Sequence, residues 1–131
     1  MRHRRAARAT ALTLGALLVL APVGVTPEGC GDLTGGRLCV EGGPVGGEGT
    51  FTTRYVRHGA GGDDTAAATF QLGYQRKDPR ITAFPGWFGT LRTKDGVTTA
   101  TGTLDTARGE CVRGVLRHDG REYVTKWLCS S

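Results

Sequence analysis

The chain has 131 residues, with 17 Lys and Arg against 12 Asp and Glu, and a pI of about 9.4. An apolar run over residues 11–25 follows four arginines, Arg2, Arg4, Arg5 and Arg8. Because this run is short for a membrane span, residues 1–29 are predicted to be a secretory signal peptide. Taking those four arginines from the 17 basic residues leaves 13 against the 12 acidic ones. This near-neutral balance argues against a nucleic-acid partner. No membrane attachment is expected after signal removal, because the apolar run is short and no stop-transfer flank follows it.

Residues 30–131 are predicted to form a single domain, because about 100 residues can bury one modest core. All four cysteines lie in this part, which suits a secreted, extracellular protein with two disulfides. Partners that are close in sequence pair more readily, so Cys30–Cys39 and Cys111–Cys129 are expected among the three connectivities that four cysteines allow. The spacings lack the short cysteine pairs of a zinc site, and neither a metal nor another cofactor is expected.

The first half of the domain consists of turns and alternating segments. Residues 30–39 predict a small hairpin or loop clipped by its cysteines, and residues 41–49 predict a glycine-rich loop. Residues 50–57 alternate in hydrophobicity and predict a strand. Residues 65–75 alternate in the same way, and we expect this strand to pair with the preceding one. Phe51, Thr53 and Tyr55 are predicted to share one side of the first strand. The side chains of the second strand predicted to face inward are Ala68, Phe70, Leu72 and Tyr74.

The middle of the chain predicts a charged turn and then a hairpin. Residues 76–81, with the sequence RKDPRI, are assigned to a turn because proline stops a strand. Residues 87–93 and 97–104 flank an Asp95-Gly96 pair, and Asp-Gly readily joins twisted antiparallel strands. Counting outward from this turn, the predicted cross-strand pairs are Trp87 with Leu104 and Phe88 with Thr103.

The C-terminal segment predicts a further hairpin, because an Asp119-Gly120 pair separates two apolar runs. With a two-residue turn, Cys111 and Cys129 point to different faces, so a one-residue bulge is expected near Glu110. The predicted pairs are Leu116 with Tyr123 and Val112 with Trp127. The residues expected to be largely buried are Trp127, Tyr123, Leu116, Leu72 and Phe70.

Short alternating segments, with no helical periodicity after Val25, predict an all-β fold. We expect a small antiparallel β-barrel or sandwich, a meander of about six strands, because closing or stacking the sheets protects open edges. This organisation resembles the small exported actinobacterial α-amylase inhibitors of the tendamistat type, which also carry two disulfides. Residues 53–55 match two of the three positions of their Trp-Arg-Tyr recognition triplet, but the cysteine spacings differ and no residue role is transferred.

Candidate catalytic residues are few. His58 and His118 are both at predicted turns, and with Lys126 or Arg117 they could form a nuclease-like site. Serine occurs after the signal only in the last two residues, which excludes serine catalysis. A small extracellular enzyme using the two histidines is therefore the alternative interpretation, and turn histidines are more often solvated bystanders.

Two candidate binding surfaces emerge from the strands and turns. The proline-stiffened basic turn could present Lys77 or Arg80 to the acidic pocket of a trypsin-type protease. A second surface is expected if Trp87 faces inward, since Phe88 would then stand outward among threonines and could stack on a sugar. The members of this surface are Phe88, Thr90, Thr101 and Thr103.

These observations favour a small secreted binding protein that is a monomer and not an enzyme. Inhibition of an extracellular hydrolase and attachment to a surface glycan are the two forms that this function could take. The expected partner is therefore an extracellular protein or a glycan. Whether His58 and His118 approach one another or a cleft discriminates this interpretation from the enzymatic one.

Overall fold

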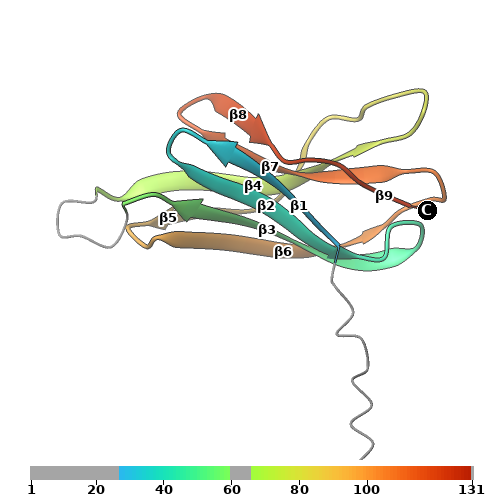
Figure 1. Ribbon diagram of the computed structural model, residues 1–131, viewed down its shortest axis with the longest axis horizontal. Coiled ribbons are helices and arrows are strands. Elements are labelled where there is room, and N and C mark those ends of the chain that lie inside the picture. Colours follow the sequence, from blue (N-terminus) through green and yellow to red (C-terminus); the bar gives the residue numbers. More distant parts are fainter. Residues whose placement is uncertain (1–26, 60–65, 131) are drawn as a thin grey trace, which may run out of the picture.

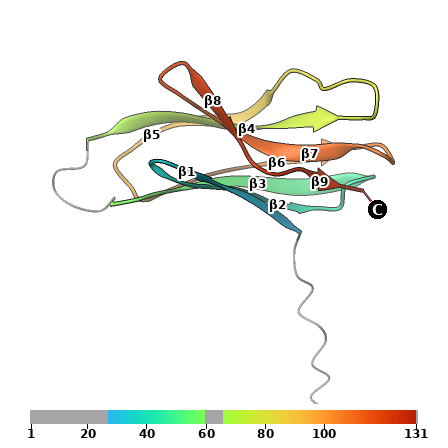
Figure 2. The same cartoon turned by 45° about the horizontal axis from the view of Figure 1, so that its top comes forward.

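The computed structural model describes residues 27–59 and 66–130, which form two antiparallel β-sheets stacked face to face (Figures 1 and 2). The first sheet has the order β1-β2-β3-β6, and the second has the order β5-β4-β7-β8, with β9 also paired to β7. The strands are β1 (Glu28–Leu33), β2 (Gly36–Gly43), β3 (Glu48–Arg57), β4 (Ala68–Lys77), β5 (Gly86–Thr93), β6 (Val97–Asp105), β7 (Cys111–His118), β8 (Arg121–Val124) and β9 (Leu128–Cys129).

The all-β prediction is confirmed, in the sandwich form rather than the barrel. The described residues hold nine strands rather than about six, and they do not follow a simple meander. The described residues contain no helix with the length and apolar character that a membrane crossing requires. Nearly all of the predicted signal peptide lies outside the described residues. Glu28 and Gly29, the last two residues of the predicted signal peptide, pair with β2.

The prediction that residues 50–57 pair with residues 65–75 is wrong, because β3 and β4 lie in different sheets. Both strands alternate as predicted, and their apolar sides face each other across the sandwich. Thr53, buried on β3, donates a hydrogen bond from Oγ1 to the Gly73 carbonyl of β4 at 2.8 Å. Stacking buries the apolar faces of both strands against one another, whereas pairing them in one sheet would leave that common face uncovered.

The predicted hairpin at Asp95-Gly96 is also wrong. Strand β5 pairs with β4 and strand β6 pairs with β3, so this turn crosses between the sheets. The Gly96 carbonyl accepts a hydrogen bond from the Arg57 amide at 2.8 Å, which directs β6 onto the end of β3. Trp87 and Leu104 therefore do not pair, nor do Phe88 and Thr103.

The C-terminal hairpin forms with the predicted two-residue turn. Asp119 and Gly120 have φ angles of 51° and 73°, which a type I′ turn requires. Leu116 lies opposite Tyr123, as predicted. Beyond β8 the register changes by one residue, so that Val112 pairs with Leu128 rather than with Trp127.

The predicted one-residue bulge exists, but it does not lie near Glu110. The extra residue lies between Val124 and Leu128, on the other strand of the hairpin. Thr125 supports the irregular backbone, because its Oγ1 accepts the Gly114 amide hydrogen at 2.9 Å. The Thr125 hydroxyl thus takes the place of the backbone carbonyl that would accept this hydrogen bond in a regular strand pair, at a buried position.

Both predicted disulfides are present and each joins residues that are directly opposite in a strand pair. The Cα–Cα distance is 4.1 Å for Cys30–Cys39 and 4.0 Å for Cys111–Cys129. The change of register in the last hairpin brings the second pair to a common face. Each bridge therefore clips a strand pair rather than joining the two sheets.

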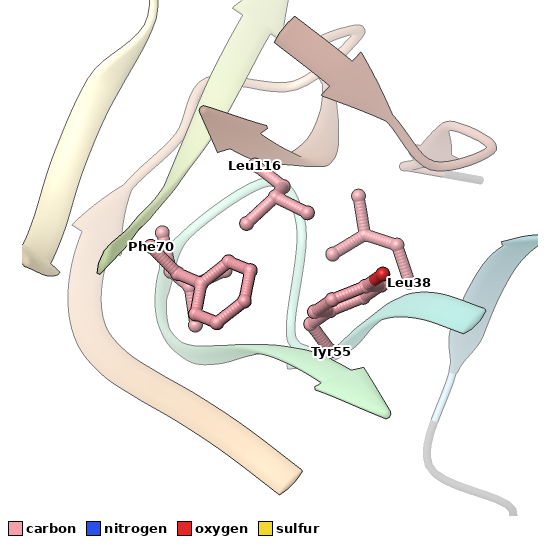
Figure 3. Close-up of a cluster of buried hydrophobic side chains, with 5 residues drawn as sticks. Leu38, Tyr55, Phe70 and Leu116 are labelled. Carbon is pink, nitrogen blue, oxygen red and sulfur yellow. The ribbon is translucent and has the colours of Figure 1, made fainter. Parts of the chain in front are cut away.

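The interior has two apolar clusters along the sandwich. One contains Leu38, Tyr55, Phe70, Leu72 and Leu116, four of which are labelled in Figure 3. The other contains Val40, Phe51, Leu104, Val112 and Leu128.

Of the five predicted core residues, Leu72, Phe70 and Leu116 are buried, whereas Tyr123 and Trp127 are only partly buried. Trp127 is displaced to the outer face of the second sheet by the extra residue before Leu128, so its predicted place in the core is wrong.

Candidate functional site

The segment between β4 and β5, residues 78–85, projects beyond the sandwich (Figures 1 and 2). It is called the projecting loop below. Its side chains include the most exposed large apolar residues of the described chain: Phe84 is 95% exposed and Ile81 is 66% exposed. The Arg80 side chain is 89% exposed. The Arg80 guanidinium lies 3.8 Å from the Asp78 carboxylate of the same loop. A large apolar ring in nearly full contact with water, on a loop that also carries an exposed guanidinium, is typical of a docking surface.

Asp78 closes the tip of the projecting loop. Its Oδ1 accepts hydrogen bonds from the amides of Arg80, at 2.7 Å, and Ile81, at 3.0 Å. The Asp78 amide donates in turn to the Ile81 carbonyl at 3.0 Å. These backbone hydrogen bonds, first from Arg80 and then from Ile81, hold the pKa of the Asp78 carboxyl below its ordinary value. The tip is thus a tight four-residue turn.

The stem of the projecting loop is tied to the end of β4. The Ala83 amide donates to the Arg76 carbonyl at 2.9 Å, and Gln75 Nε2 donates to the Ala83 carbonyl at 2.9 Å. Arg76 anchors the stem to the rest of the sandwich, because its guanidinium binds Glu110 Oε2 at 2.7 Å and the Asp105 carbonyl at 2.9 Å. Two independent attachments therefore fix the loop that carries Phe84.

Lys77 and Arg80, predicted to act in one basic loop, are presented in different ways. Arg80 lies at the tip, whereas Lys77 is the last residue of β4 and follows the direction of that strand. Its Nζ lies 4.5 Å from the centre of the Trp127 ring, on the outer face of the second sheet. Only Arg80 is offered to a partner by the loop itself.

The predicted surface around Phe88 is not formed, because its members lie in three different places. Phe88 points inward, with its ring 5.0 Å from that of Tyr74 and against Gly102. Thr90 is exposed on β5, whereas Thr101 and Thr103 are exposed on β6 of the other sheet. The wrong Asp95-Gly96 hairpin caused this error, since it placed β5 and β6 side by side.

The threonines of β6 instead form pairs with β3. Thr101 lies opposite Thr52 with their Oγ1 atoms 2.8 Å apart, and Thr103 lies opposite Thr50. These hydroxyl pairs cover the outer face of the first sheet. No aromatic ring accompanies them there, so the arrangement that suggested sugar stacking is absent from the described residues.

His58 and His118 line one cavity of about 340 Å³ at the end of the sandwich opposite the projecting loop. It is called the end cavity below. Sequence reasoning named both histidines but could not bring them together, since they are 60 positions apart and on different sheets. The other lining residues are Leu33, Thr34, Gly35, Tyr55, Arg57, Phe70, Leu116 and Tyr123.

The ring of His118 is held on both sides. Its Nδ1 lies 2.9 Å from the Thr69 carbonyl, and its Nε2 lies 3.3 Å from Asp119 Oδ2. Both ring nitrogens thus already face acceptors within the protein, which holds the ring in place. The same ring packs on Phe70, with centroids 4.8 Å apart. This geometry suits a fixed wall of a binding site better than a general base.

Arg57 and Tyr55 supply the other polar atoms of the end cavity. The Arg57 guanidinium lies over the Phe70 ring, 5.3 Å from its centre. Its Nη1 is buried and has no hydrogen-bond partner among the described residues. Burial also raises the pKa of the Tyr55 hydroxyl, which therefore stays a neutral hydrogen-bond donor.

Aromatic–cation contacts on the outer face of the second sheet were missed from the sequence. The Trp127 ring contacts both Lys77 and Arg113, and the Arg117 guanidinium is 4.5 Å from the centre of the Trp87 ring. The alternation of basic residues along β7 was the available signal, but the predicted inward position of both tryptophans hid it.

One group of potential metal ligands is brought together in the described ranges, namely Glu28 with Cys30 and Cys39. Both sulfurs are joined in the disulfide, so no thiolate is available to a metal. No protein-family model matches the chain, and a search of curated proteins found no match. The function must therefore be inferred from the projecting loop and the end cavity.

Proposed function

We propose that this protein is a small secreted binding protein that docks on an extracellular partner protein through the projecting loop. The observation that carries this proposal is Phe84, whose side chain is 95% exposed on a segment attached at its tip and its stem. Burying an aromatic side chain on binding contributes about 1.5–3 kcal/mol, so the ring is a strong anchor for a partner.

The attachment of the loop matters as much as its composition. A flexible loop loses conformational entropy on binding, at about 0.5–1.5 kcal/mol for each side chain immobilised. The Asp78 turn and the Gln75 contact have already removed much of the backbone freedom. The projecting loop therefore keeps more of its interaction energy for the partner.

The chemistry of the loop defines what the partner must offer. Phe84 and Ile81 need an apolar pocket, and Arg80 needs an acidic group beside it. An extracellular hydrolase with an acidic specificity pocket meets both needs, so inhibition of such an enzyme is the form of this function that we favour. The two disulfides are compatible with the extracellular setting.

Capture of partners from the protein's own culture fluid, followed by mass spectrometry, tests the proposal. Phe84→Ala and Arg80→Ala should each weaken capture of the same partner by at least about tenfold. Val97→Ala is the matched control, because Val97 is 51% exposed on β6 and lies outside the loop. Wild-type capture by both loop variants would overturn the proposal.

The alternative, a small extracellular enzyme, has one observation in its favour: His58 and His118 line the same cavity. The contacts of both His118 nitrogens with acceptors argue for binding instead. Assays of RNA and DNA hydrolysis with wild type and a His58→Ala/His118→Ala variant separate the two. Turnover that the double variant loses would establish a hydrolytic activity of the two histidines.

A further inference from the structure

We propose that the end cavity binds a small apolar carboxylate, an aromatic or aliphatic group that bears one carboxylate. The inference is independent of the proposed function, because the end cavity and the projecting loop lie at opposite ends of β4. The cavity volume of about 340 Å³ falls within the range of roughly 300–1,000 Å³ that small-molecule sites occupy.

The floor of the end cavity is apolar. Phe70 and Leu116 are almost completely buried there and belong to the cluster shown in Figure 3. Tyr55 stands beside Phe70 with ring centroids 5.4 Å apart and planes tilted by 54°. The rings of Tyr55 and Phe70, together with the aliphatic side chain of Leu116, can hold a flat or branched apolar group by edge and face contacts.

The polar part of the cavity favours a negative charge. Arg57 Nη1 is buried without a partner among the described residues, and a buried charged donor that lacks an acceptor is costly. A ligand carboxylate would supply that acceptor and a charge of the opposite sign. The guanidinium is held over Phe70, so the carboxylate and the apolar group of one small ligand could be accommodated together.

The remaining lining residues agree with this polarity. Among the described residues, none that lines the cavity is an Asp or Glu, whereas Arg57, His58 and His118 all line it. The carboxylate in contact with this wall, that of Asp119, is 86% exposed at the hairpin tip. An anion entering the cavity therefore meets the Arg57 guanidinium and little repulsion from the described lining residues.

Titration with 3-phenylpropionate and with its uncharged amide tests the inference, followed by amide chemical shifts and calorimetry. The acid should bind at least about tenfold more tightly than the amide, and the shifts should map to residues 55–58 and 116–123. Equal binding of the acid and the amide, or shifts confined to other residues, would overturn the proposal.

Variants of one arginine sharpen this test. Arg57→Gln should abolish the preference for the acid, and Arg57→Lys should retain part of it because a positive charge remains. Arg92→Gln is the control, since Arg92 is exposed on β5 and does not line the cavity. If Arg57→Gln fails to fold, Arg57→Lys and the acid–amide pair still decide the outcome.

A peptide with a C-terminal phenylalanine, compared with its amide, would show whether a chain terminus can serve as the carboxylate.

Discussion

The two ends of the sandwich use the same strands to different effect. At one end, Val40, Phe51 and Leu104 meet Val112 and Leu128 in a closed aliphatic and aromatic cluster. At the other end, the cluster around Phe70 opens into the end cavity (Figure 3).

Glycines at the β1–β2 turn explain part of this difference. A Cβ at Gly36 would lie 2.7 Å from the Tyr55 ring, and one at Gly35 would lie 3.1 Å from its hydroxyl. The absence of side chains there lets Tyr55 form a wall, and no aliphatic group fills the space beyond it. Alternation along a strand thus determines which side chains face inward, while the residues at the strand ends determine whether the interior closes.

The largest effect is expected in the closed cluster. Phe51 is completely buried, so Phe51→Ala should leave a void that neighbouring residues cannot fill and should cost about 3–5 kcal/mol of unfolding free energy. Urea denaturation measures the loss. A cost below about 1 kcal/mol would show that this end of the sandwich is loosely packed.

Removal of a disulfide should cause the next largest loss of unfolding free energy. Replacing both Cys111 and Cys129 by alanine should cost about 2–4 kcal/mol, because the bridge restricts the unfolded chain. The same change at Cys30 and Cys39 should cost a few tenths of a kcal/mol less, since the closed loop spans 9 rather than 18 positions. Thermal unfolding of the two double variants checks the order, and a reversed order would mean that native contacts outweigh chain entropy.

Removal of a side chain at the end that holds the end cavity should cost less unfolding free energy than removal of Phe51 from the closed cluster. Tyr123 is partly buried and lines the end cavity, so Tyr123→Ala should enlarge a space already open to solvent and cost about 1–2 kcal/mol. Urea denaturation beside Phe51→Ala gives the direct comparison. Equal losses for the two variants would remove the distinction between a closed and an open end.

Removal of the Trp127 side chain on the outer face should have an effect of similar size. Its ring contacts Lys77 and Arg113 rather than the core, so Trp127→Ala should cost about 1–2 kcal/mol, well below the loss at Phe51. Intrinsic fluorescence and denaturation would report both its partial exposure and this cost. A loss as large as that of Phe51→Ala would return Trp127 to the core.

The smallest effect concerns the pH dependence of the loop tip. Hydrogen bonds from Arg80 and Ile81 lower the pKa of Asp78 in the folded protein. Because the pKa of Asp78 is lower in the folded protein, its ionised carboxylate stabilises the tip at any pH above the ordinary pKa of aspartate. This stabilisation is lost as the pH falls through the lower pKa of the folded protein. Amide shifts of Arg80 and Ile81 should therefore stay constant from neutral pH to about pH 4 and change only below it. Movement at higher pH would contradict the closed turn.

The two Asp-Gly turns show how far the sequence alone could lead. Both pairs separate alternating segments, and only Asp119-Gly120 joins strands of one sheet. Asp95-Gly96 differs because β6 finds its partner in β3, which lies far back in the chain, and because Gly102 leaves room for the inward Phe88 ring. Local turn chemistry therefore predicted the hairpin that depends on local pairing and failed where distant strands compete.

The same contrast between local sequence and distant contacts applies to the candidate sites. Arg80 was predicted from its turn, since proline and charge mark an exposed loop, but the exposure of Phe84 depends on how the stem is tied to β4. The end cavity could not be predicted, because His58 and His118 approach it from different sheets. Trp127 was misplaced by a single extra residue between Val124 and Leu128, which no periodicity reveals.

We propose the projecting loop, with Phe84 as its anchor, as the docking site of a binding protein. Calorimetric affinities of wild type, Phe84→Ala and Val97→Ala for the captured partner test it most directly. We predict that Phe84→Ala weakens binding by at least about tenfold while Val97→Ala and all melting temperatures stay unchanged. Unchanged affinity of Phe84→Ala would contradict the claim.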